Sequence, residues 1–486
     1  MDMIIVLFII GVVYGVLLFF DNFFKTCAHY PYIKFLEGTG FHVGFFWIRW
    51  KTKAFNRILI RWGASRPRFW NIWFTIGVGT SLLILPFSVL LLLYSVLKNW
   101  TPMNTSEAFV IEPIIPGVNL PASELGYYSL TLIVCSIVHE LGHALAAVKE
   151  DVNLIEVGAN IFFVLPVAFV NISTEKLTSS GLKSLKVLCA GVWHNIVLTL
   201  VALLMYMSIP FLFSPFFHID KGIVISEIAK NSPLLGTKGL SSGDVVFQVN
   251  DCKVFNEDSW YNCLSETYKR RIAFCIDADL IRNLDESIAL RHLENGNLEC
   301  CSENQAENIC FEYLDKSNGV LELPMHACLP ARKVMEQSEH FCDLSPHICP
   351  DNQFCFKPIL ENSTHLFKLN SNHRDVIYLG HPSDIHRTIM VSSFIPKYIF
   401  TSPTIPDAVL KFIKYLIVFS LGLAILNIIP FMYMDGQYIM EIVGCWFFEE
   451  KYGKNMTRAV ISIVTWFLTF LLVSHCLYSA SKIINL

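Results

Sequence analysis

The chain has 486 residues, of which 53% are hydrophobic and only 16% are charged. Because a soluble globular protein carries roughly a quarter charged residues, this composition excludes an ordinary soluble protein and predicts a membrane protein. The formal net charge of −4 is too small to indicate a polyanionic partner. We therefore expect the chain to contact membrane lipid and to make no direct contact with nucleic acid.

Six segments are predicted to cross the membrane as helices: 3–20, 73–97, 126–148, 184–212, 407–431 and 458–479. Five of them overlap a run without Asp, Glu, Lys or Arg, and each run is close to or longer than the roughly 20 residues that a spanning helix needs. The third is interrupted by His139, Glu140 and His143. The first lacks a basic n-region and a small-residue cleavage site, so we expect a retained anchor rather than a cleaved signal peptide.

The stretch between the first two spans predicts the orientation of the chain. It carries seven Lys or Arg residues from Arg49 to Arg68, and no Asp or Glu occurs from Arg49 to Ser106. Because Lys and Arg gather in cytoplasmic loops, this stretch is expected on the cytosolic side. Within this loop, FHVGFFWIRW (41–50) is expected to form an interfacial helix.

The segments on the opposite side carry the marks of an oxidising, lumenal compartment. Ten of the 15 cysteines fall between Cys252 and Cys355, a density typical of a disulfide framework whose pairing cannot be deduced from sequence. The alternative, a zinc-ribbon module, would require paired Cys-x-x-Cys motifs, which this stretch lacks. Glycosylation sequons at Asn99, Asn104 and Asn362 agree with a lumenal position.

The segment VGANIFFVLPVAFVNIS (157–173) is uncharged but is interrupted by Gly158, Asn160 and Pro166. It is too short and too broken to span a membrane as a helix. A re-entrant hairpin fits better, because irregular backbone at membrane depth is tolerated where protein or water lines it.

The long hydrophilic segment begins with GIVISEIAKNSPLLGTKGLSSGDVVFQVND (222–251). Two apolar strands flank Ser232-Pro233 and Gly243-Asp244, a rhythm similar to the core of a PDZ domain, which binds extended peptides by adding a strand to its sheet. The cysteine-rich stretch that follows is expected to be an insertion in this module or an extension of it.

The sequence His139-Glu140-Leu141-Gly142-His143 places two imidazoles on one face of a helix, where both can reach one metal ion. The glutamate between them could take a proton from a metal-bound water. The alternative is a pair of histidines hydrogen-bonded within a packed bundle, but that role would not require Glu140. Ionisable groups in a membrane span are costly, which favours a functional site.

A catalytic zinc ion takes three protein ligands and keeps one position open, so a third ligand is needed. Asp435 is the candidate, because it follows the helix-breaking Pro430 at the cytosolic end of the fifth span, and Gly436 lets the backbone turn. At a rise of 1.5 Å per residue, His139 lies about 20 Å along the third span from Gly126, which places it at a membrane depth similar to that of Asp435. An ordinary interfacial aspartate in a turn is the alternative.

The fourth span begins with AGVWHNIVL (190–198), in which small Ala190 and Gly191 permit close helix packing. Two interpretations of its polar pair remain open. Asn195 could donate a hydrogen bond to the scissile carbonyl or its oxyanion, or the pair could join helices together. His194, and Asn427 at the end of the fifth span, are candidate contacts to substrate.

Taken together, H-E-L-G-H, A-G-V-W-H-N and N-x-x-P-x-x-x-x-D-G resemble the motifs of the site-2 protease family of intramembrane zinc metalloproteases. The segments CLPARK (328–333), GHP (380–382) and SFIPK (393–397) resemble its animal members. The resemblance implies one zinc ion per chain, with Glu140 as the catalytic base and with the ligands His139, His143 and Asp435. Met434 stands where the family often has leucine.

The resemblance also implies a function. The family cleaves single-pass, membrane-anchored transcription factors that have already been cut in the lumen, sterol regulatory element-binding proteins among them, and so releases their cytosolic part. It implies a Golgi location, with roles in sterol and lipid regulation and in the unfolded protein response. A zinc transporter would spread polar sites through the bundle, and an inactive scaffold would usually have lost Glu140 or a ligand; the sequence shows neither pattern.

The expected fold is a polytopic α-helical membrane protein, with about six transmembrane helices, a re-entrant hairpin and a lumenal, PDZ-like, cysteine-rich α/β domain. Four parts are expected along the chain. Residues 1–125 hold the anchor, the basic loop, the second span and a lumenal loop, and residues 126–217 hold the H-E-x-x-H motif and the hairpin. Residues 218–400 form the lumenal domain, and residues 401–486 carry the third ligand.

Overall fold

The computed structural model describes residues 3–100, 121–162, 165–173, 181–236, 238–270, 272–292, 298–302, 307–314, 323–338, 340–342, 349–360 and 363–484. The chain forms two compact units. The first comprises Met1–Met207 and Leu410–Leu486, and the second is Ser208–Val409.

Within the described residues, six helices are long and apolar enough to cross a membrane, which confirms the predicted number. They are α1 (Met3–Thr26), α4 (Pro67–Trp100), α5 (Leu125–Lys149), α7 (Gly181–Phe213), α12 (Thr404–Ile428) and α14 (Lys454–Ile484). Large apolar side chains such as Phe87, Met207 and Phe470 are exposed on them. Exposed apolar surface of this extent is expected where lipid replaces water as the solvent.

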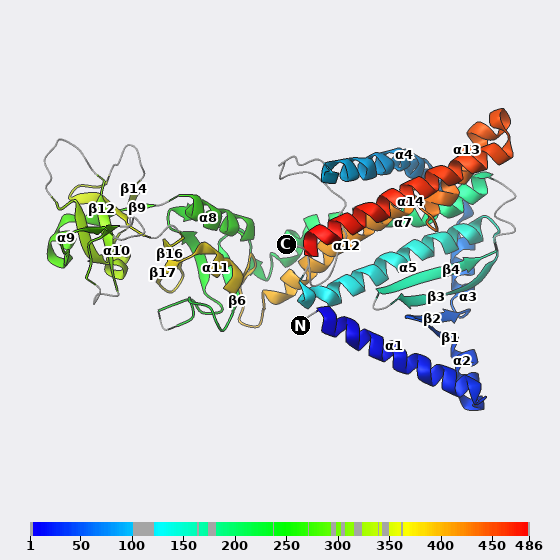
Figure 1. Ribbon diagram of the computed structural model, residues 1–486, viewed down its shortest axis with the longest axis horizontal. Coiled ribbons are helices and arrows are strands. Elements are labelled where there is room, and N and C mark those ends of the chain that lie inside the picture. Colours follow the sequence, from blue (N-terminus) through cyan, green and yellow to red (C-terminus); the bar gives the residue numbers. More distant parts are fainter. Residues whose placement is uncertain are drawn as a thin grey trace. The chain divides into compact units, whose positions relative to one another are not determined.

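Helices α4, α5, α7, α12 and α14 run alongside one another in the first unit (Figure 1). Phe74 of α4, Leu145 of α5 and Val187 of α7 belong to one buried apolar cluster. At the start of α5, which follows the short helix η1 (Ala122–Glu124), the Glu124 carboxylate accepts a hydrogen bond from Lys411 Nζ of α12 at 2.6 Å. The two helices that lead to the H-E-x-x-H motif and to Asp435 are therefore fastened together.

A four-stranded antiparallel sheet accompanies this bundle, in the order β1 (Phe41–Gly44), β2 (Trp47–Thr52), β3 (Leu154–Phe162) and β4 (Leu165–Ile172). Strands β3 and β4 form the hairpin predicted for 157–173. Short helices α2 (Tyr30–Thr39) and α3 (Asn56–Ala64) flank β1 and β2 in the chain.

The prediction of an interfacial helix over 41–50 is wrong, because this segment is the β1–β2 hairpin. Phe46 adopts a left-handed backbone (φ 57°), so the chain turns back on itself. Strand β2 then pairs with β3, and Arg49 Nε donates to Asn160 Oδ1 at 2.8 Å. These long-range partners override the amphipathic pattern, and the aromatic and β-branched residues suit a sheet.

In the second unit, one sheet has the strand order β17-β16-β7-β6-β18, with β8 paired to β7. Its strands are β6 (Ile223–Ile228), β7 (Val245–Val249), β8 (Cys252–Lys253), β16 (His365–Ser371), β17 (Asp375–Gly380) and β18 (Ile389–Ser392). Helices α8 (Glu257–Lys269) and α11 (Pro382–Thr388) pack on it, and Trp260, Ile225 and Phe367 lie in the shared core. The two apolar strands predicted in 222–251 are β6 and β7, paired to each other.

A second sheet in this unit has the order β13-β12-β15-β9-β14. Its strands are β9 (Ala273–Asp277), β12 (Asn308–Tyr313), β13 (His326–Pro330), β14 (Phe341–Cys342) and β15 (Gln353–Pro358), with helices α9 (Ala278–Leu284) and α10 (Ala331–Gln337). All of it lies between α8 and β16 in the chain. The cysteine-rich stretch is therefore an insertion, since the chain afterwards returns to the first sheet.

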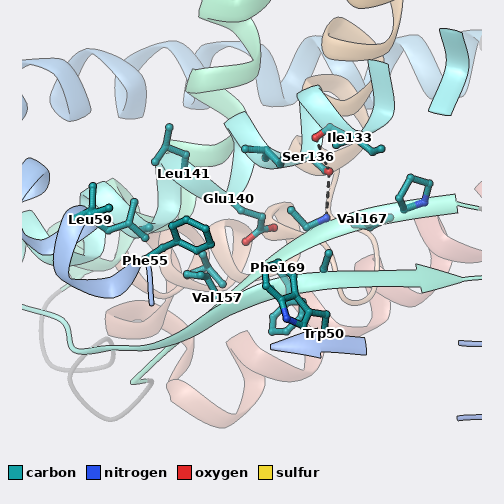
Figure 2. Close-up of a pocket in the computed structure, with 18 of the residues that line it drawn as sticks. Trp50, Phe55, Leu59, Ile133, Ser136, Glu140, Leu141, Val157, Val167 and Phe169 are labelled. Atoms are coloured by element: carbon teal, nitrogen blue, oxygen red, sulfur yellow. Dashed lines mark hydrogen bonds between the residues drawn. The ribbon is translucent and has the colours of Figure 1, made fainter. Parts of the chain in front are cut away.

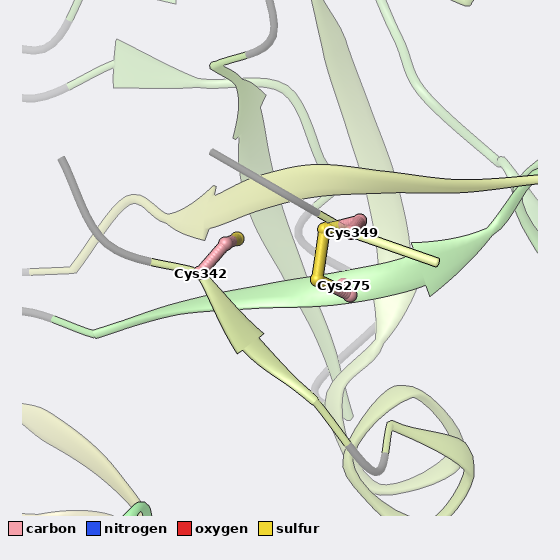
Figure 3. A group of neighbouring side chains, drawn as sticks. All are labelled: Cys275, Cys342 and Cys349. Carbon is pink, nitrogen blue, oxygen red and sulfur yellow. A yellow bond between two sulfur atoms is a disulfide. The ribbon is translucent and has the colours of Figure 1, made fainter. Parts of the chain in front are cut away.

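The ten clustered cysteines form five disulfides, as the predicted framework requires: 252–263, 275–349, 300–310, 301–328 and 342–355. Cys275, Cys342 and Cys349 bring three sulfur atoms close together, a geometry that could hold a metal. Figure 3 shows the bond between Cys275 and Cys349, and Cys342 is bonded to Cys355. Because disulfide sulfur is not a thiolate, this group is a structural staple.

The glycosylation predictions are not tested by the fold. Asn104 and Asn362 lie outside the described residues, and Asn99 occupies the last turn of α4, where its side chain is not described.

Candidate metal centre

The two histidines of the H-E-x-x-H motif lie on one face of α5 and meet. His139 Nε2 and His143 Nε2 are 3.1 Å apart, and the residues are only 7% and 9% exposed. The i, i+4 spacing brings the rings together, as the sequence predicts.

The third predicted ligand reaches the same place from the far end of the chain. Helix α12 ends at Ile428. Ile429 still donates to the Ile425 carbonyl, but Pro430 has no N–H to continue the helical hydrogen bonds, and α13 (Asp435–Tyr452) begins at Asp435. A Cβ at Gly436 would collide with the carbonyl oxygens of Ile428 and Ile429, so only glycine allows this tight return. Asp435 Oδ2 lies 3.2 Å from both His139 Nε2 and His143 Nε2.

These three ligand atoms fit a tetrahedral metal ion. Their mutual separations are 3.1 to 3.2 Å. In a tetrahedral zinc site with ordinary zinc–nitrogen and zinc–oxygen bond lengths, two ligand atoms are about 3.3 Å apart, which is close to these values. Two imidazoles and one carboxylate form a catalytic donor set, which leaves a fourth position open. The residues present therefore suit zinc.

Glu140 opens onto an apolar cavity of about 430 Å³. The cavity is lined by residues of β2, α3, α5, β3 and β4 and by Phe55 just before α3, with side chains such as Trp62, Ile137 and Val167. Figure 2 shows Glu140 projecting from α5 toward Val157 and Phe169 of the two strands. Among the described residues that line the cavity, Glu140 is the only acid, and it stands beside the candidate metal centre at the wall of a space that suits an apolar chain.

The outer ring nitrogens of both histidines have close neighbours on α7. His143 Nδ1 lies 2.8 Å from the carbonyl oxygen of Val187, so it donates there and leaves Nε2 free to bind a metal. Asn195 is fully buried, and its Nδ2 lies 3.2 Å from His139 Nδ1.

Comparison with known proteins gives this geometry a family. The model of Peptidase family M50 matches residues 127–472, more than half of the chain. The chain belongs to peptidase family M50. It is also 23% identical over 444 residues to "Membrane-bound transcription factor site-2 protease homolog" of Arabidopsis thaliana, covering 80% of this chain and 84% of that protein. This M50 chain is thus a multi-pass membrane metalloprotease, and the resemblance stated from its motifs is confirmed.

The other two predicted site residues lie elsewhere in the M50 bundle. His194 Nδ1 pairs with the Ala190 carbonyl one turn earlier at 2.8 Å, and its ring packs near Phe74 of α4. Asn427 Nδ2 donates to the Leu423 carbonyl of its own helix at 2.9 Å. Neither lines the cavity that contains Glu140, and their role in substrate binding remains a prediction.

Ser136 is a site residue that the sequence interpretation missed. Its Oγ accepts a hydrogen bond from the backbone N–H of Ala168 on β4 at 3.1 Å, which Figure 2 draws as a dashed line. The same hydroxyl donates to the Ile133 carbonyl of its own helix at 3.1 Å, which is the usual role of a lone serine in an apolar helix. Its position four residues before Glu140, on the same helix face, was the available signal.

Gly191 of α7 lies directly against the candidate ligands His139 and His143. A Cβ there would collide with His143 Nε2 and would lie 2.6 Å from His139 Nε2. We expect Gly191→Ala to displace the imidazoles and to weaken metal binding at least about tenfold. Loss of a hydrogen-bond partner of a metal-bound histidine by itself lowers metal affinity 10- to 100-fold. Metal content of the purified chain measures this. Gly79→Ala, which meets open space on α4, is the control, and equal metal content in both variants would contradict the assigned contact.

Proposed function

We propose that this M50 protein is a zinc-dependent intramembrane endopeptidase, which cuts the transmembrane helix of single-pass, membrane-anchored transcription factors after a first lumenal cut. The observation that carries the proposal is the cluster of His139, His143 and Asp435 beside Glu140, at the wall of an apolar cavity within a bundle of membrane helices. Sterol regulatory element-binding proteins are the substrates suggested by the resemblance.

His139, His143 and Asp435 would hold the zinc ion. A zinc ion held by these residues would supply Lewis-acid chemistry, polarising the scissile carbonyl and lowering the pKa of water toward neutral. Glu140 accepts that proton as the water attacks and then delivers it to the leaving amide nitrogen. The apolar walls around Glu140 keep other water away and hold the substrate segment against the carboxylate.

The substrate segment must be extended, because the peptide bonds of a helix are hydrogen-bonded and shielded. Strand β4 offers an edge for it. On one side β4 pairs with β3, and on the other its Ala168 N–H points to Ser136 of α5. Residues 166–170 of β4 line the cavity beside Glu140. A substrate strand that pairs with this edge would bring its backbone alongside the catalytic carboxylate.

Ser136 occupies a hydrogen-bond donor that such a strand would need. We expect Ser136→Ala to free the Ala168 N–H and to lower KM by roughly two- to tenfold, the value of one hydrogen bond, with kcat unchanged. Steady-state cleavage kinetics with a single-pass substrate measure this. Ser136→Thr keeps the hydroxyl and is the control. An unchanged or raised KM in Ser136→Ala would count against docking at this edge.

In this proposal the second unit lies in the lumen and is a PDZ-like domain. It acts as a filter that admits substrates already cut on the lumenal side. Its five disulfides support an oxidising compartment, and the basic stretch from Arg49 to Arg68 supports a cytosolic position for the active-site end. The Golgi membrane is the proposed location, with glycosylation at the lumenal sequons.

Reconstituted vesicles test the function. The purified chain is mixed with a labelled single-pass substrate that carries either a short or a long lumenal flank, and the products are mapped by mass spectrometry. We expect a cut within the apolar span of the short-flank substrate, loss of cleavage with a zinc chelator, and slower cleavage of the long-flank form. A cut outside the span, or cleavage insensitive to the chelator, would contradict the proposal.

A further inference from the structure

Asn195 lies behind the metal centre rather than in the cavity. Its side chain is fully buried on α7, and its amide meets His139 at Nδ1, the ring nitrogen that faces away from Asp435. It is not among the residues that line the cavity with Glu140. This position is poorly suited to a donor for the oxyanion of a substrate, but it is well suited to control of His139.

The tautomer of His139 decides what Asn195 must do. To bind a metal through Nε2, a neutral imidazole must carry its proton on Nδ1, and that proton needs an acceptor. The amide nitrogen of Asn195 now stands 3.2 Å from Nδ1, and its Oδ1 is buried without a hydrogen bond among the described residues. The two ends of an asparagine amide have nearly the same shape, so which end faces the ring follows from the hydrogen-bond chemistry. Only the carbonyl oxygen can accept from Nδ1–H.

We infer that Asn195 is a positioning residue for the metal centre: its Oδ1 accepts a hydrogen bond from His139 Nδ1 and holds the ring in the tautomer and orientation that bind zinc. This inference rests on the proposed zinc site. It gives His139 the same kind of support that the Val187 carbonyl gives His143.

The backbone around Asn195 is held in place for this role. Its carbonyl oxygen accepts hydrogen bonds from Thr199 Oγ1 at 2.9 Å and from Ser420 Oγ of α12 at 2.8 Å. Ser420 lies on the helix that leads to Asp435. Asn195 therefore links α5, α7 and α12, the three helices whose relative positions bring the ligands together.

Zinc affinity of the purified, full-length chain tests the inference, measured by competition with a chromogenic chelator. Asn195→Leu removes the acceptor at similar size and should weaken zinc binding 10- to 100-fold. Asn195→Asp keeps an acceptor oxygen and should stay within about threefold of the wild type. Thr199→Val removes the hydrogen bond to the backbone carbonyl of Asn195 and leaves the side-chain amide of Asn195 unchanged. This variant should bind zinc like the wild type.

The outcomes separate the inference from the proposed function. If Asn195→Leu kept full zinc affinity while cleavage fell, Asn195 would act on the substrate and the inference would be overturned. If the wild type itself bound no zinc, the proposed function would fail. Thermal unfolding of the zinc-free proteins shows whether each variant folds, and Asn195→Ala, which also lacks an acceptor, replaces the leucine variant if that one does not.

Discussion

Replacing Glu140 with glutamine should abolish cleavage while zinc stays bound. The amide has the same size as the carboxylate but cannot accept a proton from water, and general acid–base catalysis typically contributes 10²- to 10⁴-fold to a rate. Among the described residues, Glu140 is the only acid that lines the apolar cavity, so no described neighbour there could substitute for it. We therefore expect kcat to fall by at least about a hundredfold.

Cleavage of a single-pass substrate and zinc content are measured on the same Glu140→Gln sample. Glu156→Gln is a matched control, because this glutamate lies on β3, outside the cavity lining, and bonds to Asn171. Cleavage at the wild-type rate in Glu140→Gln would remove Glu140 from the mechanism. Zinc loss in that variant would mean that Glu140 helps to build the metal site rather than to move a proton.

Asp435→Ala should remove both zinc and activity. It leaves two imidazoles where a catalytic zinc ion takes three protein ligands. Loss of a residue that only supports a ligand costs 10- to 100-fold in metal affinity, so loss of a ligand itself should cost at least about a hundredfold.

The control for this variant lies on the same helix. Glu441 of α13 pairs with Arg458 near the surface, and Glu441→Ala should keep its zinc. Zinc content of both purified proteins is compared with that of the wild type. Full retention of zinc by Asp435→Ala would show that the third ligand is another residue.

The membrane helices and the meeting of the three candidate metal ligands could be predicted because their signals are local. Uncharged runs mark the spans, the i, i+4 spacing of His139 and His143 fixes a shared face, and Pro430 ends α12 just before Asp435. Depth along the spans then brought the three ligands to one level. The structure brings these three side chains together, with Asp435 Oδ2 lying 3.2 Å from both imidazole Nε2 atoms.

The sheet beside α5 could not be predicted as easily, because its pairing is long-range. Arg49 of β2 lies opposite Asn160 of β3, far away in the sequence, and nothing local in 41–50 distinguishes a strand from an amphipathic helix. The edge of β4 and its contact with Ser136 depend on that pairing. They therefore appear only in the folded chain.

Disulfide pairing and ring contacts escape sequence analysis for a similar reason. Cys310 and Cys328 face each other on neighbouring strands, yet each is bonded to one of the adjacent cysteines Cys300 and Cys301. Likewise, the sequence places Asn195 in the fourth span but cannot say which nitrogen of His139 it meets. Such contacts follow from how helices and strands pack, not from the spacing of residues along the chain.

X-ray absorption at the zinc edge of the purified, full-length chain tests the central claim most directly. The account predicts about one zinc ion per chain, with nitrogen and oxygen neighbours at about 2.0 to 2.2 Å and the two-imidazole signature of His139 and His143. Absence of zinc, or sulfur neighbours at about 2.3 Å, would contradict it.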